Sequence, residues 1–330
     1  MELVTTGVDM VPDALPQGHD TARVRADGRP LPLFRADLRR IPNVRNALSL
    51  VGLYAQTGAV IYAAVRWAPW AVLAAFVLMG RAHAQFASLM HEAAHRLLFS
   101  SKRINDLVGR WLLGFPTFNS TDAYRRVHMA HHRDEFGPDE PDMALYVGYP
   151  IGRASFRRKL IRDATGRTGF KLFRQLLGNL RHPNPQSRRA TRQILALQAL
   201  LFGAAIVSGH WWVYPVLWVG PYLTVWRVIN RLRSIAEHGG MRRSSDRRES
   251  THSVRQHLLA RFLIVPYHIG WHLAHHVDSG VPFRNLPRLH RALHEAGYVD
   301  TTLEYPSYPA IWRALAAERP GLAASPATSC

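Results

Sequence analysis

Cysteine is almost absent from this sequence. Its 330 residues contain one cysteine, Cys330, which excludes a disulfide framework within the chain and any metal site built from clustered thiolates. A secretory leader is not expected either, because residues 1–20 have neither a basic start nor a long apolar run. Because the chain has only one cysteine, a zinc or iron–sulfur site built on cysteine is excluded.

Acidic residues are also scarce. The chain has 23 Asp and Glu against 42 Lys and Arg, for a formal net charge of +19 and a pI near 11.1. A balance this basic favours an anionic partner, either nucleic acid or an anionic lipid surface. No nucleic-acid-binding motif accompanies the arginines, so we expect membrane lipid and no nucleic acid.

Charge is missing altogether from two long stretches. Residues 46–65 form twenty uncharged positions and residues 193–226 form thirty-four. A twenty-residue helix spans roughly 30 Å, the thickness of a bilayer core, whereas thirty-four residues would span roughly 51 Å. We therefore expect a turn at Ser208-Gly209-His210. With a further apolar run after Pro69, the pattern predicts four transmembrane helices in two hairpins, at about residues 46–65, 69–90, 193–208 and 211–229.

The arginines and lysines predict the orientation of these helices. Eighteen Lys and Arg lie between residues 100 and 192, and seven Arg lie between residues 20 and 45. The short connections within the two hairpins, around residues 66–69 and 208–210, carry one Arg between them. The basic flanks and both termini are therefore expected on the cytosolic side of an inner or cytoplasmic membrane. The expected division is an N-terminal cytosolic arm at 1–45, disordered or loosely attached over residues 1–20, a domain at 46–310, and a C-terminal tail at 311–330.

Eighteen histidines are present, and three clusters of them carry the chemistry. Spacings of three and four residues put side chains on one face of a helix, and imidazole suits iron, zinc, copper and nickel. With four membrane crossings, all three clusters fall on the same side of the membrane. The clusters are HEAAH, HMAHH and HLAHH, with candidate metal ligands His91, His95, His128, His131, His132, His272, His275 and His276.

The first cluster alone is the signature of a zinc protease, with Glu92 as the base. Such an enzyme needs one further ligand and a position open to water. Eight clustered imidazoles are too many for one tetrahedral zinc ion and suit two metal ions with an open face between them. A zinc metalloprotease and a non-catalytic metal-binding membrane protein remain as alternatives.

The three histidine boxes, with paired apolar helices between them, resemble the membrane fatty acid desaturase and hydroxylase superfamily over roughly residues 45–310. This resemblance implies an all-α membrane protein, with four transmembrane helices in two hairpins and a cytosolic helical cap that holds a di-iron site. It also implies a ninth ligand, His238, because family members carry a histidine shortly after the fourth membrane helix. The stretch RSIAEHG at 233–239 is similar to the subgroup of dihydrorhizobitoxine desaturase, which acts on a small amino-acid derivative.

The function that the resemblance implies is an O2-dependent desaturase that uses two iron ions (Fe2+/Fe3+) on an acyl chain or an acyl-like small metabolite. A hydroxylase of the same superfamily is the alternative. Electrons would come from a ferredoxin or a cytochrome b5-type donor on a separate protein. The chain itself shows neither a glycine-rich dinucleotide-binding motif nor the His-Pro-Gly-Gly signature of a fused cytochrome b5.

Four polar residues are expected just outside the ligands. In such sites a carboxylate or amide orients a ligand imidazole or a metal-bound water. Asp122 and Glu135, which flank the second box, are weighed for the same role, whereas His290 and His294 are expected to be structural or at the surface. The four expected outer residues are Asn230, Glu92, Asp134 and Glu237.

Overall fold

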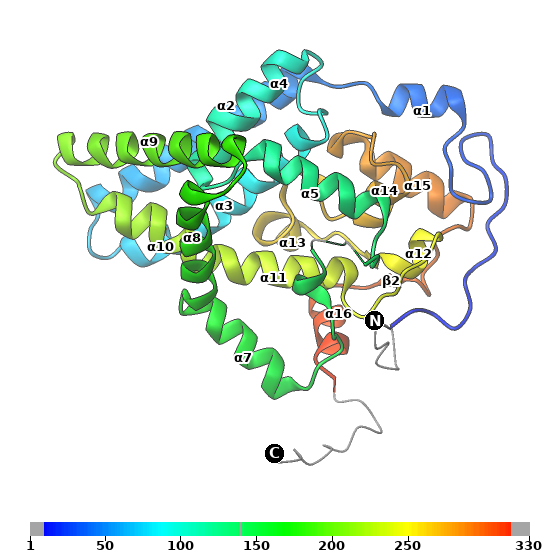
Figure 1. Ribbon diagram of the computed structural model, residues 1–330. Helices are drawn as coiled ribbons and strands as arrows, with labels where there is room; N and C mark the ends of the chain where they lie inside the picture. Colours follow the sequence, from blue (N-terminus) through cyan, green and yellow to red (C-terminus); the bar gives the residue numbers. More distant parts are fainter. Residues whose placement is uncertain (1–9, 139, 141, 318–330) are drawn as a thin grey trace.

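The computed structural model describes residues 10–138, 140 and 142–317, and within them the protein is almost wholly helical (Figure 1). The sheet in this part of the chain is one parallel pair, β1 (Ser253–Val254) and β2 (Glu304–Tyr305). The expectation of an all-α architecture is therefore confirmed. The arm and tail residues 1–9 and 318–330 lie outside the described residues.

The first half of the chain contains two apolar helices, the second of which ends in the first histidine box, and the helices that follow this box. These elements are α1 (Pro32–Leu38), α2 (Asn43–Arg66), α3 (Val72–Ala94), α4 (Lys102–Val108), the π-helix η1 (Gly109–Gly114), the 3-10 turn η2 (Phe115–Thr117), α5 (Thr121–Arg133), α6 (Met143–Tyr146), α7 (Arg153–Ala164) and α8 (Arg167–Gly178).

The second half begins with another 3-10 turn and the third long apolar helix. Its helical elements are η3 (Asn179–Arg181), α9 (Pro185–Val207), the π-helix η4 (Tyr214–Val219), α10 (Gly220–Leu223), α11 (Val225–His238), α12 (Arg247–Ser250), α13 (Leu258–Leu263), η5 (Pro266–His268), α14 (His272–Val277), η6 (Phe283–Asn285), α15 (Leu286–Glu295) and α16 (Tyr308–Leu315). The last of these spans the domain boundary expected at residue 310.

Within the described residues, three helical segments are long and apolar enough to cross a membrane: Pro32–Arg66, Val72–Ala94 and Pro185–Val207. Many of their large apolar side chains face outwards, among them Leu48 of α2 and Leu200 of α9, which are both about two-thirds exposed. An apolar exterior of this extent suits lipid rather than water. Helices α2, α3, α9 and α10 gather on one side of the molecule, away from α12, α14 and α15 (Figure 1).

The stretch expected as a fourth transmembrane helix at 211–229 is helical but interrupted. It passes from the π-helix η4 into α10, and the backbone departs from helical angles at Thr224 (φ −119°, ψ −85°) before α11 begins. Proline at positions 215 and 221 removes backbone donors within this stretch. The expected turn before it is present, since α9 ends at Val207 and Gly209 has a φ of +76°, a conformation that favours glycine.

The described part of the N-terminal arm is packed against the segments that follow α11 and α15, contrary to the expectation of a loose segment before residue 20. Backbone hydrogen bonds join Met10 N–H to Gly240 (2.6 Å) and His19 N–H to Ala296 (2.8 Å). Farther along, the buried Asp278 carboxylate accepts hydrogen bonds from Arg35 (2.6 Å) and Arg39 (2.8 Å). These partners are distant in sequence, which is why composition alone did not reveal the attachment.

Helix α3 is the central element, because it packs against α2, α5, α10 and α11. The N-terminal half of α3 is mostly apolar, and its last turn carries the first histidine box. Gly80 permits a close approach of α3 to α11, since a Cβ at this position would meet the Val225 side chain. This contact helps to fix the position of α11 along α3, and the last residue of α11 is His238.

We predict that Gly80→Ala lowers the midpoint of thermal unfolding in detergent, with a destabilisation of about 1–3 kcal/mol, because the β-branched Val225 cannot move aside. The matched control is Gly58→Ala in α2, where no atom lies within 4 Å of the added Cβ. The control should be neutral or stabilising, since alanine favours the helix over glycine. Equal midpoints for the two variants would contradict the packing described.

Candidate metal centre

Nine buried or half-buried histidines converge in two adjoining groups, and they are the nine that the sequence analysis selected. Within each group the nitrogen atoms that face one another lie within 4.8 Å. The five-histidine group comprises His91, His95, His128, His132 and His275, and the four-histidine group comprises His131, His238, His272 and His276.

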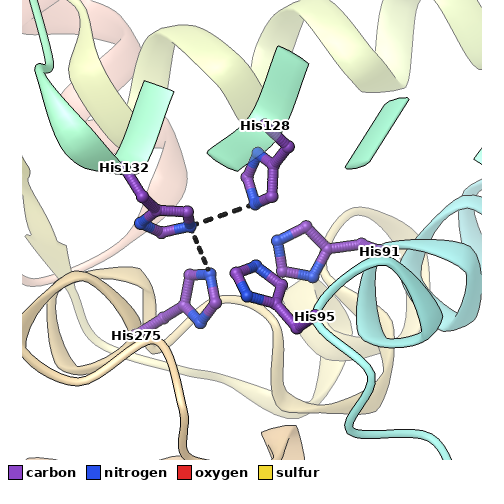
Figure 2. A group of neighbouring side chains, drawn as sticks. All are labelled: His91, His95, His128, His132 and His275. Atoms are coloured by element: carbon purple, nitrogen blue, oxygen red, sulfur yellow. Dashed lines mark hydrogen bonds between the residues drawn. The ribbon is translucent and has the colours of Figure 1, made fainter. Parts of the chain in front are cut away.

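Three segments build the five-histidine group. His91 lies in the last turn of α3 and His95 is its C-cap, while His128 and His132 lie one turn apart on α5. Figure 2 shows the five rings turned towards a common centre, with His275 reaching in from α14. The Nε2 atom of His132 lies 3.0 Å from Nε2 of both His128 and His275.

The four-histidine group uses the same helices in a different way. Adjacent residues on a helix point about 100° apart, so α5 can direct His132 into one group and His131 into the other. On α14, His275 and His276 divide in the same manner. The H-x-x-H-H spacing therefore serves two neighbouring sites at once, and the ring centroids of His132 and His276 are 4.4 Å apart.

The nitrogen geometry fits metal coordination. Two nitrogens bound at 2.0–2.1 Å and at right angles about one ion lie about 3.0 Å apart, and the contacts His238–His272 (3.1 Å) and His272–His276 (3.0 Å) between Nε2 atoms match this value. Both ring nitrogens of His91 and Nε2 of His95 are buried without a hydrogen-bond partner. Such atoms cost about 1–3 kcal/mol each when unsatisfied, and a bound metal ion would satisfy one nitrogen of each ring.

The protonation state also suits a metal. Burial lowers the pKa of His128, His132, His272, His275 and His276 well below the usual range, and repulsion between neighbouring imidazolium charges acts in the same direction. These rings are therefore neutral, which is the form that binds metal.

Three rings of the four-histidine group are held from outside through Nδ1. His131 donates to Glu140 (2.8 Å), His238 to the carbonyl of Ser250 (2.9 Å), and His276 to Glu135 (2.5 Å). Each bond fixes the tautomer and leaves Nε2 free to face the group. Burial favours neutral His131, but Glu140 outweighs it and the pKa of His131 is raised.

Glu135 and Glu140 are the principal outer residues; the sequence indicated Glu135 only weakly and Glu140 not at all. Glu135 follows the second box by three residues and was one of several carboxylates considered there. Its buried carboxylate also contacts Arg247 (2.5 Å) and the hydroxyl group of Ser250. Glu140 lies in the loop after α5, nine residues from His131, where no helical spacing links the two residues.

Two of the four expected outer residues have other partners. Glu92 is buried but accepts a hydrogen bond from the backbone N–H of Phe283 (3.0 Å) rather than from an imidazole. Asp134 is paired with Arg243 (2.8 Å) at the surface. Glu92 directly follows His91 on α3, and helical geometry turns it away from the face that the histidine uses. Asp134 lies two residues after the end of the second box, at the C-cap of α5, where the backbone leaves the helix.

The other two expected outer residues lie beside the centre. Glu237 approaches Nδ1 of His272 at 3.5 Å and is paired with Arg233 (3.1 Å); burial nevertheless raises the pKa of Glu237 to about 7. Asn230 borders a cavity next to the histidines. It lies two turns before His238 on α11, so both side chains face the same side of that helix.

This cavity has a volume of about 200 Å³ and is bordered by both groups of histidines. His91 and His128 of the first group and His131, His238 and His272 of the second reach its wall, and the remaining wall contains apolar and charged side chains. The apolar residues are Ala84, Ala87, Met90, Leu145, Trp226 and Ile264, and the charged residues are Asp142, Arg227, Arg233 and Glu237.

Comparison with known proteins agrees with this arrangement. Residues 66–309 match the fatty acid desaturase family. The chain is also 25% identical, over 261 residues, to dihydrorhizobitoxine desaturase from Bradyrhizobium elkanii, and the match covers 74% of each protein. The matched family range contains both groups of histidines in full.

We predict that Glu135→Gln weakens metal binding by about 10–100-fold, because an amide cannot hold the His276 ring as the carboxylate does. Competition between the purified protein and a coloured chelator measures the affinity. Asp134→Asn is the matched control, since it makes the same change one residue earlier and affects only the surface pair with Arg243. Affinities that fall equally in both variants would contradict the role of Glu135.

Proposed function

Because the chain belongs to the fatty acid desaturase family, we propose that it is an O2-dependent desaturase that holds two iron ions in its nine-histidine centre. Family membership supports a desaturase-like oxidoreductase. The observation that carries the proposal furthest is that two adjoining all-histidine groups border one cavity. A pair of ions in these groups would both face a substrate in that cavity.

The donor set supports iron. Neutral imidazoles suit iron as well as zinc, but five and four of them exceed what tetrahedral zinc requires. The position of Glu92, which is bonded to Phe283 N–H and is not among the residues of the cavity wall, gives no support to a metalloprotease base. When bound, the iron pair supplies the O2-dependent oxidation of an unactivated C–H bond.

The residues of this chain would hold the reacting segment of the substrate and keep water out. Ala84, Ala87 and Trp226 provide an apolar wall beside His91 and His128, which favours an alkyl segment there. Asn230 and Ser234 lie on the same wall, where the Asn230 amide would orient a polar group next to the metals. Positioning of this kind is the protein's main contribution when a cofactor carries the chemistry.

The substrate is proposed to be an acyl chain or an acyl-like small metabolite. A volume of about 200 Å³ is below the ~300–1,000 Å³ of common ligand pockets, which favours a compact reacting segment. The similarity to an enzyme named for dihydrorhizobitoxine favours the small metabolite. Electrons would come from a ferredoxin or a cytochrome b5-type donor at the basic surface.

For the membrane arrangement, we propose four crossings in two hairpins: α2 with α3, and α9 with the interrupted stretch at 211–229. The termini and the histidine boxes would lie on the cytosolic side of the inner membrane. The support is the distribution of charge, since eighteen Lys and Arg lie between residues 100 and 192 while the short connections carry one Arg.

We predict that membranes containing the protein, supplied with O2 and a ferredoxin reducing system, convert the substrate to a product with two fewer hydrogens. Mass spectrometry of metabolites and lipids from an expressing host identifies the product. A product with one added oxygen would support the hydroxylase alternative instead. Turnover that continues without O2, or cleavage of peptides, would contradict both oxidative functions.

We further predict that Ala87→Phe lowers kcat/KM at least about 10-fold, equivalent to about 1.4 kcal/mol, because the ring fills the cavity. Metal content should stay unchanged, since Ala87 is not a ligand. Ala204→Phe, the same change at an exposed position of α9, should retain activity. If Ala87→Phe is as active as the wild type, the substrate does not occupy this cavity.

A further inference from the structure

A second group of metal-binding side chains lies outside the nine-histidine centre. His290 and His294 are one turn apart on α15, so they point to the same side of the helix. Glu304 of β2 faces them, and the three ligand atoms lie within 4.8 Å of one another. None of these residues contributes to the centre described above.

The distances in this cluster fit tetrahedral coordination. Ligands at 2.0–2.1 Å from a tetrahedral ion are about 3.3–3.4 Å apart. The Oε1 atom of Glu304 lies 3.1 Å from Nε2 of His290 and 3.7 Å from Nε2 of His294. The two separations lie just below and just above the value for a shared tetrahedral ion, so small side-chain movements would suffice to bind one.

Exposure divides the cluster into a fixed base and an accessible edge. The side chain of Glu304 is 8% exposed and that of His290 is 14% exposed, whereas that of His294 is 30% exposed. The carboxylate and one imidazole are therefore held in place, and solvent can supply the fourth ligand beside His294. A site of this kind loads from solution without unfolding of the protein.

One cation competes for the carboxylate. The Arg255 guanidinium lies 3.5 Å from Glu304, but it contacts Oε2, while the histidines face Oε1. Because Arg255 is more than half exposed, its pairing with the carboxylate is weak. The two oxygens can therefore serve the arginine and a metal ion separately.

We propose that His290, His294 and Glu304 bind one divalent transition-metal ion of the zinc class. Two imidazoles and a carboxylate are a donor set that zinc uses widely, with water in the open position. The ion would fasten α15 to β2. Helix α15 packs against α14, which carries three ligands of the nine-histidine centre, and β2 pairs with β1, which begins three residues after Ser250.

The ion would therefore stabilise the contact between α15 and β2. These two segments adjoin α14 and β1, and the ion would lie outside the cavity beside the nine histidines. The inference does not depend on the proposed desaturase function, because it concerns other residues and predicts binding rather than turnover.

The test uses the full-length protein in detergent, with its metal content measured first. After incubation with zinc chloride and gel filtration, the wild type should retain about one additional zinc ion per chain with its iron unchanged. His294→Gln and Glu304→Gln should retain the same iron and lose the additional zinc. Zinc should also raise the unfolding midpoint of the wild type by about 2 °C or more, and not that of either variant.

The matched control is His182→Gln, which removes an exposed imidazole from the connection between α8 and α9 and should retain the additional zinc. Equal zinc in the wild type and both cluster variants would overturn the proposal. Zinc uptake matched by loss of iron would also overturn it, because the zinc would then occupy the nine-histidine centre. The side chain of His294 is partly exposed, whereas that of Glu304 is mostly buried and charged. If one of the two substitutions causes misfolding, the other variant still tests the proposal.

Discussion

The burial of nine imidazole rings beside one another is the constraint on which the rest of the structure depends. Each ring loses its contact with water. Several Nε2 atoms lie about 3 Å apart, and neutral imidazoles have too few N–H groups to form a hydrogen bond at every one of these contacts. A pair of metal ions would resolve this conflict, because each ion would accept lone pairs from several neutral rings at once. Without such ions, the unsatisfied nitrogens of His91 and His95 would weigh against the folded state.

The helices are arranged to meet this constraint. Helix α3 runs from an apolar surface to the first histidine box, and α11 begins beside it at Gly80 and ends on His238. Helices α5 and α14 each supply histidines to both groups. A ring of outer partners then sets the direction of the imidazoles, with Glu135 joining α14 to the loop after α5 and to the segment around Ser250.

Helical spacing is a local property, so the sequence could indicate which histidines the structure brings together. The H-x-x-H-H pattern specifies which faces of α5 and α14 carry histidine, and family resemblance added His238. The outer residues depend on tertiary contacts, so nearness in sequence to a box histidine was misleading for Glu92 and Asp134, which bond to Phe283 and Arg243. Glu140 carried no signal, since its link to His131 is made by a loop.

The fold, like the site, was predictable from the sequence only where a local pattern determines it. Long apolar runs predicted α2, α3 and α9, because length and hydropathy suffice for such helices. They could not reveal the break at Thr224, nor the parallel pairing of Ser253 with Glu304, which joins segments fifty residues apart. The attachment of the arm through Asp278 was likewise invisible, because both arginines that bind it read as ordinary surface charge.

The central claim is that the two groups of histidines hold a pair of iron ions, and elemental analysis of the purified, detergent-solubilised protein tests it most directly. The account predicts about two iron ions per chain, with fewer in His132→Ala, which removes a ring at the junction of the groups, and no loss in His252→Ala, which removes a buried ring outside them. A single zinc ion in place of the iron, or equal iron in the two variants, would contradict it.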